Sequence, residues 1–214
     1  MSLNTNLKGR VRNINLPKSN ILFPLFETVV NSIHAIDEKI DMDNHFKISD
    51  GDIKIKIIRS SQLITTKEKS EIIGFEIIDN GIGFNKINYN SFQTLDTEYK
   101  LNLGGKGVGR LLWLKAFSKV SINSYYQENK VIYNRMFNFT IAQDIHNEKN
   151  EKVSVSGDLR TSVTLLNLLD GYKDYLPKSI NAIANALFEH CLWYFLREGG
   201  VYYSPFFRPR FCFS

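Results

Sequence analysis

The stretch EIIGFEIIDNGIGF, residues 71–84, decides how the rest of this sequence is interpreted. Its first part, Glu71–Ile78, is apolar and rich in β-branched residues, which predicts a buried strand that stops at Asp79–Gly81. Asn-Gly between two strands is a strong hairpin signal, so a hairpin is one interpretation. The residues after Gly83 lack the alternation of a partner strand. This favours a second interpretation, in which the strand ends in a ligand-binding loop.

Predicted helices and predicted strands flank this stretch. From Asn20 to about Glu38, apolar residues recur at helical spacing, and Asp52–Arg59 alternates isoleucine with lysine like a half-buried strand. Because strands cluster without strict βαβ alternation, we expect an α+β fold: a two-layer sandwich with helices on one face of a mixed, mostly antiparallel sheet. Further along the chain we expect a short helix near Tyr89, a helix at Leu111–Phe117, strands at Lys119–Tyr126, Val131–Ala142, Val153–Ser156 and Ser162–Leu168, and a final helix at Lys178–Leu196.

The bulk composition describes an ordinary globular chain. Of 214 residues, 43% are hydrophobic, which is enough for a core, and the net charge of +5 suits an anionic partner such as a nucleotide or nucleic acid. The two cysteines, Cys191 and Cys212, have no paired spacing, so we expect a cytoplasmic protein without disulfides or zinc, and no membrane segment is recognisable. We divide the chain into a basic arm (1–18), one domain (19–198) and an aromatic, basic tail (199–214) that leads to a further region.

A polar stripe runs along the first predicted helix. Glu27, Asn31, His34 and Glu38 fall on one side of it, opposite the apolar face. One interpretation is a solvated helix surface. The other is a ligand site, because a carboxylate can orient and deprotonate a water and an amide oxygen is a suitable ligand for Mg²⁺.

A glycine cluster, Gly104–Gly109, precedes the predicted helix that contains Leu111. Its glycines expose backbone N–H groups, and the helix that follows presents its positive N-terminal end to phosphate oxygens. It is not a Walker A loop, because Lys106 is followed by glycine rather than Ser or Thr, and no strand leads into it as a dinucleotide fold requires. At Asp79, similarly, a carboxylate beside glycines can accept a hydrogen bond from an adenine amino group.

Taken together and in this order, the motifs resemble the GHKL superfamily of ATPases (gyrase, heat-shock chaperone, histidine kinase, MutL), which has the Bergerat fold. The resemblance rests on Glu-x-x-x-Asn, Asp-Asn-Gly-x-Gly-Phe, Gly-x-x-Gly-x-Gly and a strand that bears Thr161. It covers about residues 20–168. The segment Gly104–Phe117 is also similar to large bacterial ATP-binding proteins in which this domain is only the N-terminal part.

The resemblance implies a role for each matching residue. Glu27 is the expected general base, Asn31 the expected Mg²⁺ ligand, and Asp79 the residue that reads the adenine amino group with help from a water and Thr161. The glycines and Lys106 are expected to form a lid over ATP. The nucleotide-binding set implied in this way is Asn31, Asp79, Gly81, Gly83, Gly104, Gly105, Lys106, Gly107, Val108, Gly109 and Thr161.

The expected function is therefore Mg-ATP binding with slow hydrolysis, which drives an ATP-dependent homodimer of a larger protein that acts on DNA or another protein. Two departures from the family pattern are His34, where an aspartate is common, and Arg160, where glycine is usual. The alternatives are a nucleotide sensor that does not hydrolyse ATP and a histidine-kinase-type phosphotransfer domain. The glutamate one turn before Asn31 favours the hydrolase branch.

Overall fold

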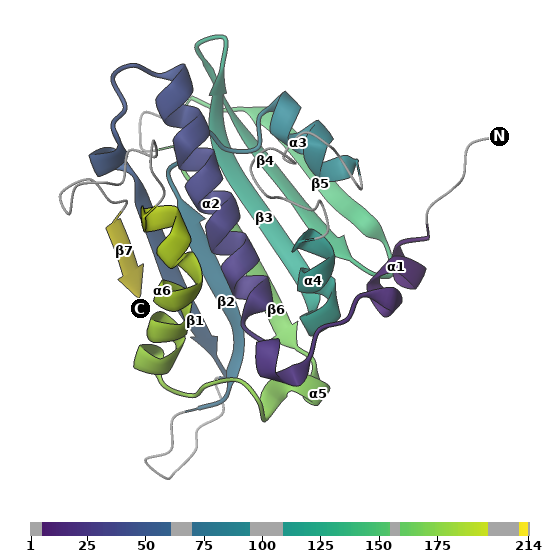
Figure 1. The fold of residues 1–214 in the computed structure, drawn as a ribbon. Helices are drawn as coiled ribbons and strands as arrows, with labels where there is room; N and C mark the ends of the chain where they lie inside the picture. The colour runs from purple at the N-terminus through teal and green to yellow at the C-terminus, as the bar shows by residue number, and fades with distance from the viewer. Residues whose placement is uncertain (1–5, 61–69, 95–108, 155–158, 197–209, 214) are drawn as a thin grey trace.

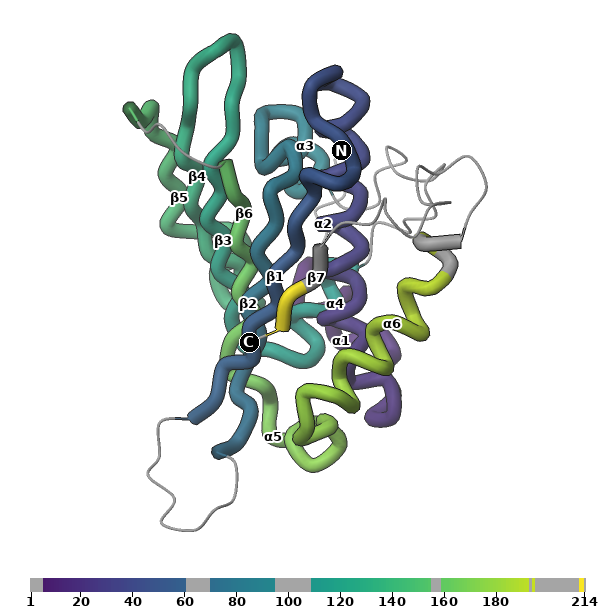
Figure 2. The backbone as a smooth tube through the Cα atoms, turned by 90° about the vertical axis from the view of Figure 1, so that its left-hand side faces the viewer, coloured from purple at the N-terminus to yellow at the C-terminus, as the bar shows by residue number. Residues whose placement is uncertain are grey.

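The computed structural model describes residues 6–60, 70–94, 109–154, 159–196 and 210–213. These residues form an α+β fold in which the helices lie on one face of a seven-stranded mixed sheet (Figures 1 and 2). In chain order the elements are α1 (Leu7–Asn13), the short 3-10 helix η1 (Lys18–Asn20), α2 (Phe23–Met42), η2 (Ile48–Asp50), β1 (Asp52–Arg59), β2 (Ile72–Asp79), α3 (Lys86–Gln93), α4 (Gly109–Ala116), β3 (Phe117–Glu128), β4 (Val131–Thr140), β5 (Asp144–Lys152), β6 (Thr161–Leu168), α5 (Asp170–Lys173), α6 (Ile180–Leu196) and β7 (Arg210–Phe213).

The strands are ordered β5-β4-β3-β6-β2-β1-β7 across the sheet. Neighbouring strands are antiparallel except for β1 and β7, which are parallel, so the expected mixed and mostly antiparallel sheet is confirmed. β6 joins the sheet between β2 and β3, although about 80 residues of chain separate it from β2. This insertion places the end of β2 beside the start of β6, where Asp79 is paired with Thr161.

Helix α2 is the helix whose residues lie at the centre of the core between the helices and the sheet. Pro24 is tolerated near its start because the first helical residues need no intrahelical N–H bond. One side of the helix is apolar at the expected spacing and packs on β1 and β2, while α4 lies beside its N-terminal half (Figure 1). The helix residues at the centre of the core are Leu25, Val29, Ile33 and Ile36.

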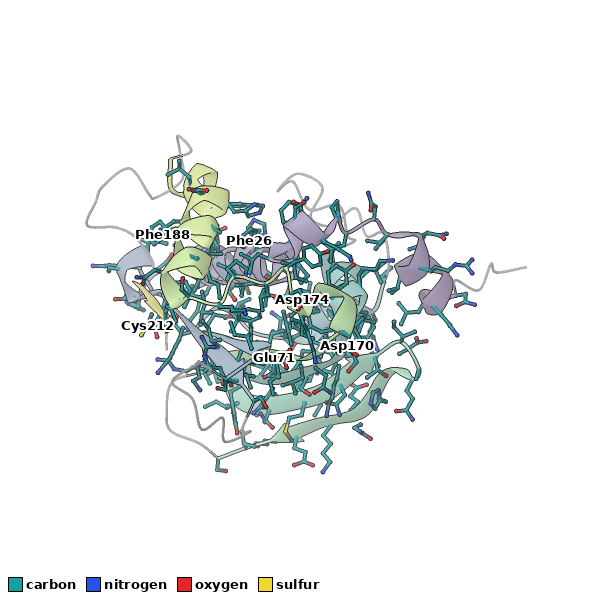
Figure 3. The ribbon with its side chains drawn as sticks, turned by 90° about the horizontal axis from the view of Figure 1, so that it is seen from below. Phe26, Glu71, Asp170, Asp174, Phe188 and Cys212 are labelled. Carbon is teal, nitrogen blue, oxygen red and sulfur yellow. The ribbon has the colours of Figure 1, made fainter. Side chains whose placement is uncertain are left out.

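The last helix, α6, packs against α2. The ring of His190 stacks on Phe26 with centroids 4.4 Å apart, and Figure 3 shows Phe26 on the side of α2 that faces α6. Along the described residues, no helix is both long enough and apolar enough to cross a bilayer.

Three segments differ from the sequence predictions. A strand was expected at Val153–Ser156, but the strand of this region is β5, and Val153 and Ser154 follow it outside any strand. Part of the predicted polar arm forms α1, whose Leu7 and Val11 are buried in the core. Part of the predicted tail forms β7, which extends the sheet beside β1.

Candidate functional site

Asp79, the last residue of β2, is a buried carboxylate at one end of the sheet, and only 3% of the residue is exposed. Its Oδ2 atom accepts a hydrogen bond of 2.8 Å from the hydroxyl of Ser32 on α2. Its Oδ1 atom accepts the backbone N–H of Gly81 at 3.0 Å. Because each carboxylate oxygen can accept two hydrogen bonds, both oxygens keep capacity for a donor from a ligand.

Burial raises the pKa of the Asp79 carboxyl from 3.8 to about 6. The hydrogen bonds from Ser32 and Gly81 oppose this shift, as do the positive charges of Lys39 and Arg160, but burial has the largest effect. Asp79 is therefore mostly ionised at neutral pH. A buried, ionised acceptor forms stronger hydrogen bonds than a neutral one, so it is well suited to read an amino group.

Hydrogen bonds fix the loop after Asp79 both to the start of β1 and to α2. The Asn80 side chain accepts the backbone N–H of Asp52 at 2.8 Å and donates to the carbonyl of Asp50 at 2.8 Å. Lys39 of α2 donates to the Asn80 carbonyl at 2.7 Å. The chain then continues into α3 rather than into a partner strand, so the hairpin interpretation is wrong. The asparagine here ties the loop to β1 instead of forming a two-residue turn.

Both glycines of this loop are required by close packing. A Cβ atom on Gly81 would lie 2.6 Å from the backbone carbonyl carbon of Ala35 on α2. Gly83 has a φ of +76°, and a Cβ atom there would lie 2.9 Å from both Ser124 Oγ and Tyr126 Cβ. A side chain at either position would push the loop away from α2 or from the sheet.

Thr161, the first residue of β6, completes this group of polar side chains. It lies opposite Asp79 in the strand register and is only 4% exposed. Its Oγ1 atom is 2.7 Å from Ser124 Oγ on β3, which also accepts the backbone N–H of Phe84 at 2.9 Å. The fold thus brings Asp79, Gly83 and Thr161 together, as the sequence analysis expected. It also adds Ser32 and Ser124, which no sequence pattern indicated.

Glu27 lies at a second position on α2, against the first residue of α4. A Cβ atom on Gly109 would meet the Glu27 carboxylate, so the two residues are in close contact, and a side chain at position 109 would displace the Glu27 side chain. Burial raises the pKa of Glu27 above its ordinary value of 4.5. The N-terminal end of a helix carries partial positive charge, which favours a carboxylate or a phosphate beside it. The end of the glycine cluster and the Glu-x-x-x-Asn motif of α2 therefore lie in contact.

The polar stripe on α2 does not face a single environment. Asn31 is half-buried, and its amide forms no hydrogen bond to another described residue. His34 is only 6% exposed and lies against Tyr194 of α6, with ring centroids 5.6 Å apart. Glu38 accepts a hydrogen bond of 3.2 Å from Asn88 of α3. The interpretation of the stripe as a solvated surface is wrong at His34, and the departure from the family pattern there is a packing contact with α6.

The two halves of the site are joined by α2. Ser32, which contacts Asp79, follows Glu27 by five residues, or about 7.5 Å of helix rise. Asn31 lies between them. The five glycine-cluster positions Gly104, Gly105, Lys106, Gly107 and Val108 lie outside the described residues, so their predicted roles stay predictions.

Comparison with known proteins adds no family to this geometry. No protein-family model matches the sequence, and no curated protein matches it. The resemblance to GHKL ATPases therefore rests on the sequence motifs.

Arg160, the second departure from the family pattern, lies at the same end of the sheet. Its guanidinium forms an ion pair of 2.8 Å with Asp52 at the start of β1. Both side chains are partly exposed, so this pair contributes little to stability. Its positive charge nevertheless lowers the pKa of Asp79, against the larger effect of burial.

Arg110, which the sequence analysis did not single out, joins the two helices that flank residues 95–108. It is the second residue of α4, and its residue exposure is only 9%. Its guanidinium donates to carbonyls at the end of α3: to Ser91 at 3.0 Å, to Phe92, and to Thr94 at 2.5 Å. These carbonyls have no partner within their own helix, so a cation is favourable there.

We expect Arg110→Met to lower the free energy of unfolding by about 2–4 kcal/mol, because three carbonyls at the end of α3, one of them on the buried Phe92, lose a charged donor. Urea denaturation measures this change. The control is Lys115→Met on the same helix, since the amine of the half-buried Lys115 has, among the described residues, a single hydrogen bond, to the Arg12 carbonyl at 3.0 Å. We expect the control to cost less than about 1 kcal/mol. Equal losses in the two variants would show that Arg110 does not hold the end of α3.

Proposed function

We propose that this chain is an ATP-binding domain of the GHKL type, which binds Mg-ATP and hydrolyses it slowly. The observation that carries the proposal is the meeting of residues from separate motifs along one helix. Asp79 and Thr161 lie near Ser32 at one position, and Glu27 lies against Gly109 about 7.5 Å of helix rise earlier. This arrangement provides a place for the adenine base beside Asp79 and a place for the phosphates beside the start of α4.

The chemistry of the first end supports an adenine ligand. Asp79 is an ionised acceptor with spare capacity, and the glycine at position 83 leaves the backbone bare beside it. An adenine amino group is a donor, whereas guanine has a carbonyl oxygen in the same place. Two acceptors that face each other repel, and the remaining acceptor capacity of the buried carboxylate then finds no donor, which is costly. The site therefore favours ATP over GTP.

The chemistry of the second end supports a triphosphate with a cation. The start of α4 attracts an anion, but the Glu27 carboxylate beside it repels phosphate oxygens. A bound Mg²⁺ would offset that repulsion. Asn31, between Glu27 and Ser32 on α2, offers a hard amide oxygen with no other described partner, which fits a single protein ligand to Mg²⁺. Phosphate oxygens and waters would fill the remaining positions, and the ion would neutralise phosphate charge.

Calorimetry tests the binding proposal directly. We expect the wild-type chain to bind ATP in the presence of Mg²⁺, to bind GTP at least about tenfold more weakly, and to lose ATP affinity when EDTA is added. Asn31→Ala should bind ATP equally with Mg²⁺ and with EDTA. The matched control is Asn185→Ala, an exposed asparagine on α6, which should keep the Mg²⁺ dependence.

Each part of this experiment can fail separately. Wild-type affinity that EDTA leaves unchanged would remove magnesium and Asn31 from the site. Equal affinity for ATP and GTP would remove the proposed adenine reading. No measurable nucleotide binding would contradict the whole proposal.

We further propose that ATP binding is coupled to homodimerisation of a larger protein with a DNA or protein client. This step rests on the resemblance to the GHKL superfamily. The two alternatives differ in the fate of the γ-phosphate: a nucleotide sensor leaves it on ATP, and a histidine-kinase-type domain transfers it to protein. Phosphate release from γ-labelled ATP, compared with the formation of labelled protein, separates all three functions.

A further inference from the structure

The hydroxyl of Ser124 lies behind the candidate base-binding residues, in a fully buried position on β3. Its residue exposure is 0%, and its Oγ atom has two hydrogen-bonding neighbours among the described residues. One is the backbone N–H of Phe84, at 2.9 Å, and the other is Thr161 Oγ1, at 2.7 Å. Gly83 packs directly on the pair, since a Cβ atom there would lie 2.9 Å from Ser124 Oγ and 3.4 Å from Thr161 Oγ1.

The direction of the hydrogen bond between the two hydroxyls follows from counting protons. The Phe84 N–H can only donate, so it occupies one lone pair of Ser124 Oγ. The single proton of Ser124 then needs an acceptor, and Thr161 Oγ1 is the acceptor within reach among the described residues. A buried hydroxyl proton without an acceptor is unfavourable. The Thr161 proton would also need an acceptor, but Thr161 is 4% exposed at the start of β6 whereas Ser124 is 0% exposed, so the Thr161 proton is the one that a bound ligand could receive. This difference favours Ser124 as the donor and Thr161 as the acceptor.

This direction leaves the proton of Thr161 for a different partner. Thr161 is opposite Asp79 in the strand register, so the end of the sheet presents an acceptor and a donor next to each other. Adenine has the complementary pattern on one edge: an amino donor next to a ring-nitrogen acceptor. Guanine and hypoxanthine have the reverse pattern, a carbonyl acceptor next to an N–H donor.

We propose that Ser124 is a positioning residue that orients the Thr161 hydroxyl as a donor, and that this orientation helps the site select a base with adenine's edge. The proposal rests on the proposed function, because it concerns how the same site reads its nucleotide. Ser124 acts through Thr161 and does not touch the base. Gly83 keeps the two hydroxyls sheltered from water by packing on them.

The experiment compares ATP with 1-deaza-ATP, which keeps the amino group but lacks the ring nitrogen that would accept from Thr161. We expect the wild-type chain to prefer ATP by up to about tenfold, the range of one neutral hydrogen bond. Thr161→Val, which removes the donor at similar volume, should abolish the preference. Ser124→Ala should reduce it to about twofold, because the Thr161 proton is then free to turn away.

The double variant separates orientation from a general packing effect. Because Ser124 acts through Thr161, the variant with both changes should match Thr161→Val alone in its ratio of affinities. The control is Ser121→Ala on the same strand. The Ser121 hydroxyl lies away from the site and donates to the side-chain oxygen of Asn138 at 2.8 Å. It should keep the wild-type preference.

The results distinguish this inference from the proposed function. If the wild-type chain binds ATP and 1-deaza-ATP equally, or if Ser124→Ala keeps the full preference, the role of Ser124 is overturned while ATP binding stands. If Ser124→Ala does not fold, Ser124→Cys takes its place: a thiol has nearly the same volume but is a weak donor and acceptor, so it should also reduce the preference to about twofold. If the wild-type chain binds neither nucleotide, the proposed function fails, and this inference fails with it.

Discussion

Replacing Glu27 with glutamine is expected to lower the rate of ATP hydrolysis by about 10²–10⁴ while leaving ATP affinity nearly unchanged. Glutamine keeps the size of the side chain and its contact with Gly109 but cannot take a proton from water. Measuring phosphate release and ATP affinity on the same samples separates the loss of a base from the loss of binding. Phosphate release should also be measured over a range of protein concentrations, because ATP binding is proposed to be coupled to homodimerisation.

The pH dependence of hydrolysis provides a second test of Glu27. Burial raises the pKa of this carboxyl above 4.5, and only the ionised form can act as a base. The rate should therefore rise with pH through the raised pKa. In Glu27→Gln this rise should disappear.

A matched control for Glu27 is Glu38→Gln on the same helix. Glu38 accepts a hydrogen bond from Asn88 and lies about 16 Å of helix rise from Glu27, so the substitution should leave the hydrolysis rate within about threefold. If Glu27→Gln releases phosphate at the wild-type rate, Glu27 is not the base. If the wild-type protein binds ATP but releases no phosphate at any protein concentration, the nucleotide-sensor function replaces hydrolysis.

The second large effect is expected at Asp79, where stability and binding should change in opposite directions. The folded-state pKa of about 6 lies above the ordinary value of 3.8, so between these pH values the folded chain binds more protons than the unfolded chain. Stability should therefore fall as the pH rises through this window. The total cost at pH 7 is about 3 kcal/mol.

Asp79→Asn removes the ionised carboxylate and keeps a neutral acceptor of the same shape. We expect a gain of up to about 3 kcal/mol in the free energy of unfolding at pH 7 and loss of the slope between pH 3.8 and 6. ATP affinity should fall about tenfold, because a hydrogen bond to a charged acceptor becomes one to a neutral acceptor. Denaturation at several pH values and calorimetry with ATP measure the two effects.

The neighbouring carboxylate of Asp52 provides the control for this experiment. It is partly exposed and paired with Arg160, so Asp52→Asn should give no gain in stability. An Asp79→Asn protein with wild-type ATP affinity would exclude Asp79 from the nucleotide site. Unchanged stability at all pH values would instead show that burial does not destabilise the ionised carboxylate.

Local patterns were sufficient for the elements whose burial alternates regularly. The isoleucines of Asp52–Arg59 alternate with lysines, and this segment was predicted with the bounds that β1 has. The helix expected at Asn20–Glu38 is α2, which begins at Phe23 and continues to Met42. β5 was not predicted, because an edge strand with both faces largely exposed needs no apolar alternation, and its sequence is almost entirely polar.

For the candidate site, the sequence by itself determined which residues are candidates for the proposed chemistry. A carboxylate after an apolar strand, a carboxylate and an amide one turn apart on a helix, and glycines before another helix are recognisable because each depends on neighbours within a few residues. The strand that bears Thr161 could likewise be recognised from its own residues. Periodicity reports which face of a segment is buried, but not which segment covers it.

Only the tertiary structure decided the partners of these residues. The insertion of β6 between β2 and β3 placed Thr161 opposite Asp79 and beside Ser124, and the packing of α6 on α2 buried His34. The packing of α4 near α3 likewise brought the Arg110 guanidinium to the carbonyls at the end of α3. The physical reason is that these contacts join residues far apart in the chain, so they depend on strand order and helix packing, which are properties of the whole core rather than of any local pattern.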